Sequence, residues 1–129
     1  MPENDDDAWV MACSSFLIYL GGDLTSLGKL MSKRKYAKVE NCVKQLKQGC
    51  NVALFVSQGI STSSTLEAAK TEYEGVLTTT IKLADECHRG VVEMTKGERV
   101  KAATHINDAR VLMENVKTRF PNIPVLLGR

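Results

Sequence analysis

The chain has 129 residues, of which 43% are apolar and 25% are charged, as in one ordinary globular domain. With one Trp, three Tyr, three Phe and three Pro, it has little material for a β-sandwich or barrel. The formal net charge of +2 is too small, over the whole chain, to indicate a nucleic-acid-binding protein.

The chain opens on an acidic segment. Residues 1–7 read Met-Pro-Glu-Asn-Asp-Asp-Asp, where a signal peptide would carry basic residues. The longest apolar run, residues 8–13, is too short to cross a bilayer. We therefore expect a cytoplasmic protein without a transmembrane segment, beginning with an acidic tail over residues 1–6.

A first helix is expected after this segment. Residues from Asn4 to Asp7 offer an N-cap and negative charge at its N-terminus. Gly21 and Gly22 interrupt the helix and cost about 2 kcal/mol relative to alanine, so a bend or a close helix crossing is expected there. The apolar positions recur at spacings of three and four: Trp9, Cys13, Phe16, Leu20, Leu24, Leu27 and Met31.

Two further helices are expected from the same periodicity. The residues Ser64-Thr65-Leu66-Glu67 fit a capping box at the start of the third helix. The apolar positions of the second are Tyr36, Val39, Val43, Leu46, Cys50, Ala53, Val56 and Ile60. Those of the third are Leu66, Ala69, Tyr73, Val76, Thr80, Ala84, Cys87, Val91 and Met94.

The fourth expected helix ends at Pro121, because proline cannot continue a helix. Its apolar positions are Ala102, Ile106, Ala109, Met113, Val116 and Phe120. The links at residues 32–35, 57–63 and 95–98 are short, and short links make consecutive helices antiparallel.

The predicted fold is all-α, an antiparallel up-and-down four-helix bundle in a single domain over residues 1–129. A short C-terminal tail is expected over residues 121–129. We expect eight side chains, two from each helix, to be buried together: Phe16, Leu20, Val43, Leu46, Val76, Ala84, Met113 and Val116.

Four cysteines are spaced by 29, 8 and 37 residues, at Cys13, Cys42, Cys50 and Cys87. This spacing matches no zinc-binding or CxxC pattern. In a reducing compartment they are interpreted as small core residues, with redox sensing or a disulfide as the alternatives.

The segment KAATHINDARVLMENVKTRF, residues 101–120, resembles the last helix of focal-adhesion-targeting domains and of the vinculin, α-catenin and talin bundles. The matching positions are Ala102, Ala103, His105, Ala109, Leu112, Met113 and Val116. The resemblance implies a non-enzymatic scaffold of the adhesion and cytoskeleton type. Such bundles bind partner helices in grooves between helices, and some bind acidic lipids through basic faces. The Gly21–Gly22 pair and the acidic start depart from that pattern.

The two histidines lack a catalytic or metal-binding motif. Cys87 and His88 are adjacent, so on a helix their side chains point about 100° apart. His105 has Asp108 three residues later, a spacing that places both on one face. The chain has no Gly-rich phosphate loop, no HExxH and no Glu-x-x-His pair. We therefore expect no catalytic residue, no metal and no cofactor.

Histidine phosphotransfer is the alternative function, because phosphotransfer domains are helical bundles of similar size. They display an exposed histidine in the order His-x-x-Lys-Gly. His105 is followed by Ile-Asn-Asp-Ala and His88 by Arg-Gly-Val-Val, and an aspartate beside the acceptor would repel the incoming phosphoryl group.

The predicted binding site is a basic stripe from Lys29 to Lys47, in which Glu40 is the sole acid. A solvated helix face is its simplest reading; an electropositive groove edge is the functional one. Tyr36 is the only aromatic residue between the basic residues of the stripe, which argues against binding of single-stranded nucleic acid. The predicted site residues are Lys33, Arg34, Lys35, Lys38, Val39, Val43, Lys44, Leu46 and Lys47.

The function predicted from the sequence is therefore a non-enzymatic scaffold or adaptor. Its partner would be a protein with an acidic amphipathic helix, and an anionic lipid surface is a second candidate. Val39, Val43 and Leu46 would form an apolar groove floor, with lysines at its edge.

Overall fold

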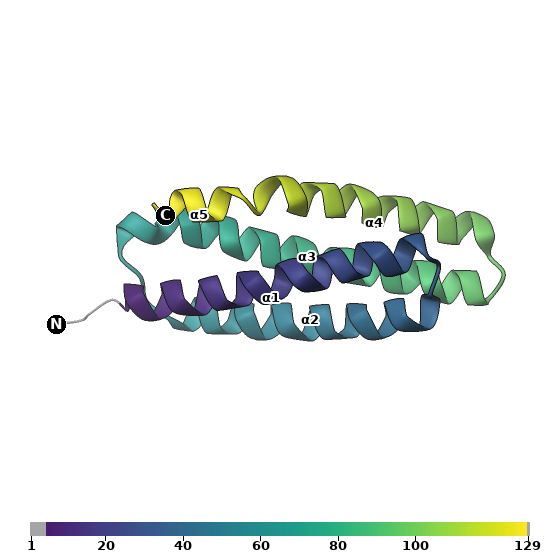
Figure 1. Ribbon diagram of the computed structural model, residues 1–129, viewed down its shortest axis with the longest axis horizontal. Coiled ribbons are helices and arrows are strands. Elements are labelled where there is room, and N and C mark those ends of the chain that lie inside the picture. Colours follow the sequence, from purple (N-terminus) through teal and green to yellow (C-terminus); the bar gives the residue numbers. More distant parts are fainter. Residues whose placement is uncertain (1–4, 129) are drawn as a thin grey trace.

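The computed structural model describes residues 5–128, which are helical apart from short connections and contain no strand. Figure 1 shows four long helices lying side by side along the longest axis. The elements are α1 (Asp6–Ser32), α2 (Tyr36–Gly59), the single 3-10 turn η1 (Ser64–Leu66), α3 (Glu67–Thr95), α4 (Arg99–Arg119) and α5 (Asn122–Leu126). The all-α prediction, with four helices packed against each other, is confirmed.

Helix α3 is the centre of the packing. It packs against α2 on one side and α4 on the other, while α1 packs mainly on α2. α5 returns to α3, at the end of the bundle where α1 begins (Figure 1). The bundle therefore has a closely packed part, α2 to α4, and a more peripheral helix, α1.

The predicted core is confirmed at seven of its eight positions. Leu20, Leu46, Val76 and Val116 have no exposed surface, and Val43, Ala84 and Met113 are also buried. Phe16 is the exception, since it packs half-buried against the edge of the core. Val10 and Leu17 of α1 are buried as well, because α1 has apolar residues on more than one side.

Of the two alternatives expected at Gly21 and Gly22, the close helix crossing is wrong, and the bend stays a prediction. α1 runs from Asp6 to Ser32 without interruption, and a Cβ placed on Gly22 would meet nothing within 4 Å. No helix crosses at Gly22. A Cβ on Gly21 would lie 3.7 Å from the Phe120 ring, which is an ordinary contact.

The close approach between helices occurs at Gly90 instead. This glycine of α3 is buried, and an added Cβ would lie 2.8 Å from Cγ1 of Ile106 and 3.5 Å from the carbonyl oxygen of Ala102. Because no side chain separates them, α3 and α4 come together at this point.

These two glycines should respond oppositely to alanine. Gly22→Ala should raise the free energy of unfolding by about 0.5–1 kcal/mol, because alanine is the better helix former and the site is open. Gly90→Ala should lower it, because overpacking costs about 1–3 kcal/mol and exceeds the gain in helix propensity. Urea unfolding of both variants is the measurement; equal shifts would contradict the crossing at Gly90.

The helix starts agree with the sequence prediction only in part, since Asp6 and Asp7 supply the expected acidic first turn of α1. Asp5 is the N-cap of α1 but makes no side-chain capping hydrogen bond, and Asn4 lies outside the described residues. The predicted capping box is also wrong: residues 64–66 form a 3-10 turn and no side chain caps α3. Asp6 accepts hydrogen bonds from Ser63 instead, from its N–H at 2.8 Å and its hydroxyl at 2.6 Å. These bonds lower the pKa of Asp6 and tie the start of α1 to the loop before α3.

The C-terminal segment is not a tail. α4 ends at Arg119, two residues before Pro121, where the sequence predicted the helix to stop. After Phe120 and Pro121 the chain forms α5. Ile123 of α5 has no exposed surface. Nε of Arg119 donates to Glu72 of α3 at 2.8 Å, and this interaction lowers the pKa of Glu72. The last helix is thus part of the core.

The cysteines agree with the core interpretation. All four are free; Cys13, Cys50 and Cys87 are buried and Cys42 is half-buried. Burial raises the pKa of the three buried thiols to about 12. Each of α1, α2 and α3 contributes one of them.

Helix α1 is long and apolar enough to cross a membrane by length and composition. The core helix of a globular protein passes the same criterion, and 33% of the most apolar stretch of α1 is buried in the bundle. The absence of a transmembrane segment therefore stays a prediction.

Candidate functional site

The predicted basic stripe lies on the surface, but its residues are divided between the α1–α2 turn and α2. Lys33, Arg34 and Lys35 are exposed in the turn between α1 and α2, and Arg34 has a positive φ of 54°. Lys38 and Lys44 are exposed on α2. Two residues of the stripe are paired across helices: Nζ of Lys47 lies 2.7 Å from Oδ1 of Asp85 on α3, and Glu40 contacts His88.

The predicted apolar floor is largely covered, although Val39 lines a cavity of about 710 Å³ together with Arg34 and Tyr36. Val39 and Val43 are 2% and 3% exposed, and Leu46 has no exposed surface. They belong to the core between α2 and its neighbours. The spacing placed them correctly on the inner face of α2, but that face is covered by other helices of the same chain.

A groove with a basic edge does exist, between α1 and α4. It has a volume of about 880 Å³ and forms because these two helices approach each other only sparsely. Its apolar lining comes from both sides of the groove. Met31 and Phe120 are half-buried and reachable, whereas Leu24, Met113 and Val116 lie buried beneath them. Along α1 it extends from Gly21 to Lys33, about 18 Å at 1.5 Å per residue. We call it the α1/α4 groove.

The rim of the α1/α4 groove is predominantly basic. Lys29 and Lys33 lie on the α1 side, and Arg110 and Lys117 on the α4 side. All four are exposed. Glu114 is the one acid of the lining; Nζ of Lys117 lies 3.9 Å from its Oε1. Within residues 5–128, Lys29, Lys33 and Arg110 form no ion pair, so their charges face solvent.

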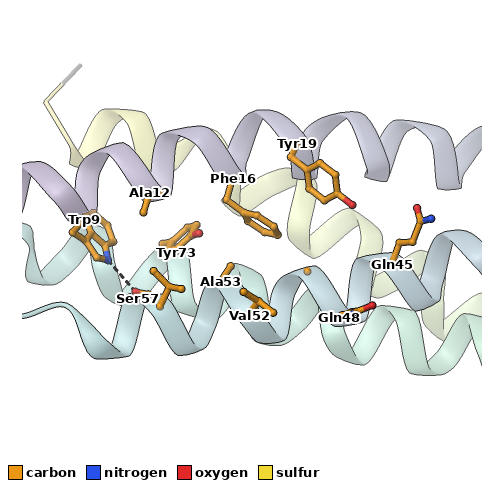
Figure 2. Close-up of a pocket in the computed structure, with 13 residues that line it drawn as sticks. Trp9, Ala12, Phe16, Tyr19, Gln45, Gln48, Val52, Ala53, Ser57 and Tyr73 are labelled. Atoms are coloured by element: carbon orange, nitrogen blue, oxygen red, sulfur yellow. Dashed lines mark hydrogen bonds between the residues drawn. The ribbon is translucent and has the colours of Figure 1, made fainter.

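A second cavity, of about 540 Å³, opens between α1 and α2. Figure 2 shows Phe16 and Tyr19 reaching from α1 toward Val52 and Ala53 of α2. A Cβ on Gly49 would lie 3.4 Å from the Phe16 ring, so the missing side chain makes room for the ring against α2. We call this the α1/α2 pocket.

One end of the α1/α2 pocket is fixed by a buried hydrogen-bond chain. Nε1 of Trp9 donates to Oγ of Ser57 at 2.9 Å (Figure 2), and the Ser57 hydroxyl donates to Oε2 of Glu74 at 2.6 Å. The Trp9 ring packs edge-on against Tyr73, with centroids 5.7 Å apart. These contacts explain why Ser57 is buried, while Val56, predicted to be in the core, is 40% exposed.

The two histidines bridge helices. Nδ1 of His88 lies 2.9 Å from Glu40 of α2. Nδ1 of His105 lies 2.6 Å from Oε2 of Glu86, and Nε2 lies 3.3 Å from Oε1 of Glu93. Both carboxylates belong to α3, so His105 connects α4 to α3. His88 is exposed and His105 is half-buried, so both lie at the edges of the contacts between helices.

Among the described residues, one group of side chains has the donor atoms for a metal ion. Ligand atoms of Glu86, His105 and Asp108 lie within 4.8 Å of one another. Imidazole and carboxylate groups suit several divalent cations. However, Oε2 of Glu86 already lies against His105 and its Oε1 accepts from Arg89 at 3.3 Å. Packing between α3 and α4 accounts for this arrangement without a cation.

Sequence reasoning missed both concave sites. Arg110 and Lys117 are seven residues apart and so share one face of α4, a signal that could have been combined with Lys29 and Lys33. The α1/α2 pocket left no comparable signal, because its walls look like ordinary apolar helix positions. Comparison of the chain with protein-family models, curated proteins and solved structures finds no match.

Proposed function

We propose that the protein is a non-enzymatic interaction module that binds an amphipathic, acidic partner helix in the α1/α4 groove. The observation that carries this proposal is the combination, in one groove, of an apolar floor with four basic residues and a single acid on its rim. A helix in a groove uses apolar anchors at i, i+3 or i+4, and i+7. The length of about 18 Å along α1 fits about three helical turns.

The basic rim favours acidic residues at the two ends of the partner helix. Exposed ion pairs contribute about 0.2–1 kcal/mol each, so Lys29, Lys33, Arg110 and Lys117 should set association rate and specificity, while the floor supplies most of the affinity. Relative to the prediction from the sequence, only Lys33 of the predicted site is kept, and the floor moves from α2 to α1 and α4.

We further propose an up-and-down, antiparallel arrangement of the four helices and a scaffold or adaptor role in the cytoplasm. The three-residue links at residues 33–35 and 96–98 support the topology. The resemblance of residues 101–120 to adhesion-type bundles supports the role. A phosphotransfer function is disfavoured, because carboxylates of Glu86 and Glu93 face both ring nitrogens of His105.

Reversal of the rim charges tests the groove. The probe is a fluorescein-labelled synthetic helix with leucines at i, i+3, i+4 and i+7 and glutamates at both ends, followed by fluorescence anisotropy. The triple variant Lys29→Glu/Lys33→Glu/Lys117→Glu should weaken binding several-fold at low salt without changing the melting temperature. The difference should shrink at high salt, because the Debye length falls to about 3 Å at 1 M.

A matched control makes the same change in net charge away from the groove. Lys38→Glu/Lys44→Glu/Lys82→Glu alters three exposed lysines, two of which belong to the site predicted from the sequence. It should bind the peptide like the wild type. Equal weakening by both triple variants, or tight binding of a scrambled peptide, would assign the effect to overall charge. If the protein fails to bind the peptide but co-sediments with phosphatidylserine vesicles, the ligand of the groove is an anionic lipid surface and not a partner helix.

A further inference from the structure

The α1/α2 pocket differs from the α1/α4 groove in its chemistry. Among residues 5–128, no residue lines both, and no charged residue lines the α1/α2 pocket. The buried end is formed by Trp9, Cys13 and Tyr73, each at most 2% exposed. The volume of about 540 Å³ lies within the range of small-molecule sites. Such a surface favours an apolar ligand because burying it removes apolar area from water.

The polar groups of the pocket lie at its two ends. At the Trp9 end, the Ser57 hydroxyl is already engaged with Trp9 and Glu74. At the opposite end, Gln45 and Gln48 lie beyond Phe16 and Tyr19 (Figure 2). Between described residues, no hydrogen bond uses either amide. Free amides can both donate to and accept from a neutral head group.

The surroundings disfavour a charged head group. The described part of the chain places no cation in the pocket lining that could pair with a carboxylate, and burying an unpaired charge is costly. Asp23, one turn after Tyr19 on α1, interacts with the Tyr19 side chain and raises its pKa. A carboxylate of a ligand at that end would face the like charge of Asp23.

We infer that the α1/α2 pocket binds an uncharged, elongated apolar ligand, such as a long-chain alcohol or amide. Its chain lies between Phe16 and Val52 with its far end near Trp9, and its neutral head group bonds to Gln45 and Gln48. From Trp9 to Tyr19 the pocket extends about 15 Å along α1, which suits an alkyl chain of medium length.

Trp9 is the only tryptophan of the chain and gives a direct signal from the pocket. The probe is the neutral dye N-phenylnaphthylamine, which accepts energy from excited tryptophan. Titration should give saturable quenching of Trp9 emission with sensitised emission of the dye. Dodecanol should displace the dye, and laurate should displace it at least about tenfold less well because of its charge. Absence of saturable transfer, or equal displacement by laurate, would overturn the assignment.

Two exposed valines on separate helices provide a matched pair of variants. Val52, 58% exposed, lines the pocket, whereas Val111, 63% exposed, lies on α4 away from it. Val52→Glu should weaken dye and dodecanol binding about tenfold or more, and Val111→Glu should leave both unchanged. Val56→Glu, at a second exposed wall position, provides an independent check if Val52→Glu lowers the melting temperature.

Three results would contradict the inference. Equal binding by Val52→Glu and wild type would place the dye elsewhere. Equal weakening by Val52→Glu and Val111→Glu would mean unspecific adsorption. A dye signal per chain that falls as protein concentration rises would mean that a second copy covers the pocket.

Discussion

Replacing Leu46 by alanine is expected to lower the free energy of unfolding by about 2–5 kcal/mol. Leu46 lies in the middle of α2, has no exposed surface and belongs to the central core. The cost has two parts. One is the lost free energy of transferring the removed carbon atoms from water into the core, and the other is the cavity, which the surrounding side chains fill only in part. Urea denaturation followed by far-UV circular dichroism measures it.

Phe55 provides the control on the same helix. It is 79% exposed, so Phe55→Ala removes more carbon atoms than Leu46→Ala and should nevertheless change the stability by no more than about 0.5 kcal/mol. If the two variants lose similar stability, α2 does not present its Leu46 face to the core, and the packing of α2 described above is wrong.

Replacing Ile123 by alanine should also cost about 2–5 kcal/mol, although only six residues follow it in the sequence. Ile123 is fully buried in the core cluster, on a helix that packs against α3. A residue in a solvated tail, as predicted from the sequence, would tolerate alanine without loss. Thermal and urea unfolding therefore distinguish directly between a tail and a core helix.

Val125 is the matched control within α5. It is 74% exposed, and Val125→Ala should leave stability within about 0.5 kcal/mol of the wild type. A small effect of Ile123→Ala, comparable to that of Val125→Ala, would show that α5 is not packed on the bundle in solution.

The periodicity of the sequence predicted the helices and most of the core. On α3, seven of nine predicted positions are buried, with Leu66 and Met94 at the two ends half-buried. The pattern missed Leu77, Leu83 and Gly90, which are also buried, because α3 packs against both α2 and α4. On α1 apolar residues also occur outside the predicted stripe, so spacing alone could not reveal that Val10 and Leu17 are buried too.

Features that depend on contacts between distant segments were not predictable. Ser57 is buried because Trp9, 48 residues earlier, donates to it, and no local rule favours a serine over Val56 in the core. Pro121 was interpreted as the end of regular structure, but a proline also suits the start of a helix, and here it is the N-cap of α5.

The candidate sites were predicted least well. The sequence identified lysines and apolar positions correctly as exposed and buried, and then joined them into one site on α2. A groove requires two helices that fail to close against each other, and that depends on how closely α1 approaches α4. The lysines of the predicted site divide accordingly: Lys33 lines the α1/α4 groove, whereas Lys47 pairs with Asp85.

The buried thiols have a consequence for how this protein meets oxidants and electrophiles. Only a thiolate reacts readily, and a pKa of about 12 in place of about 9 lowers the thiolate fraction at neutral pH about a thousandfold. Cys13, Cys50 and Cys87 are therefore chemically silent while α1, α2 and α3 stay together. Oxidation or alkylation of these thiols would therefore show that the helices had separated, and each of the three helices carries one such thiol.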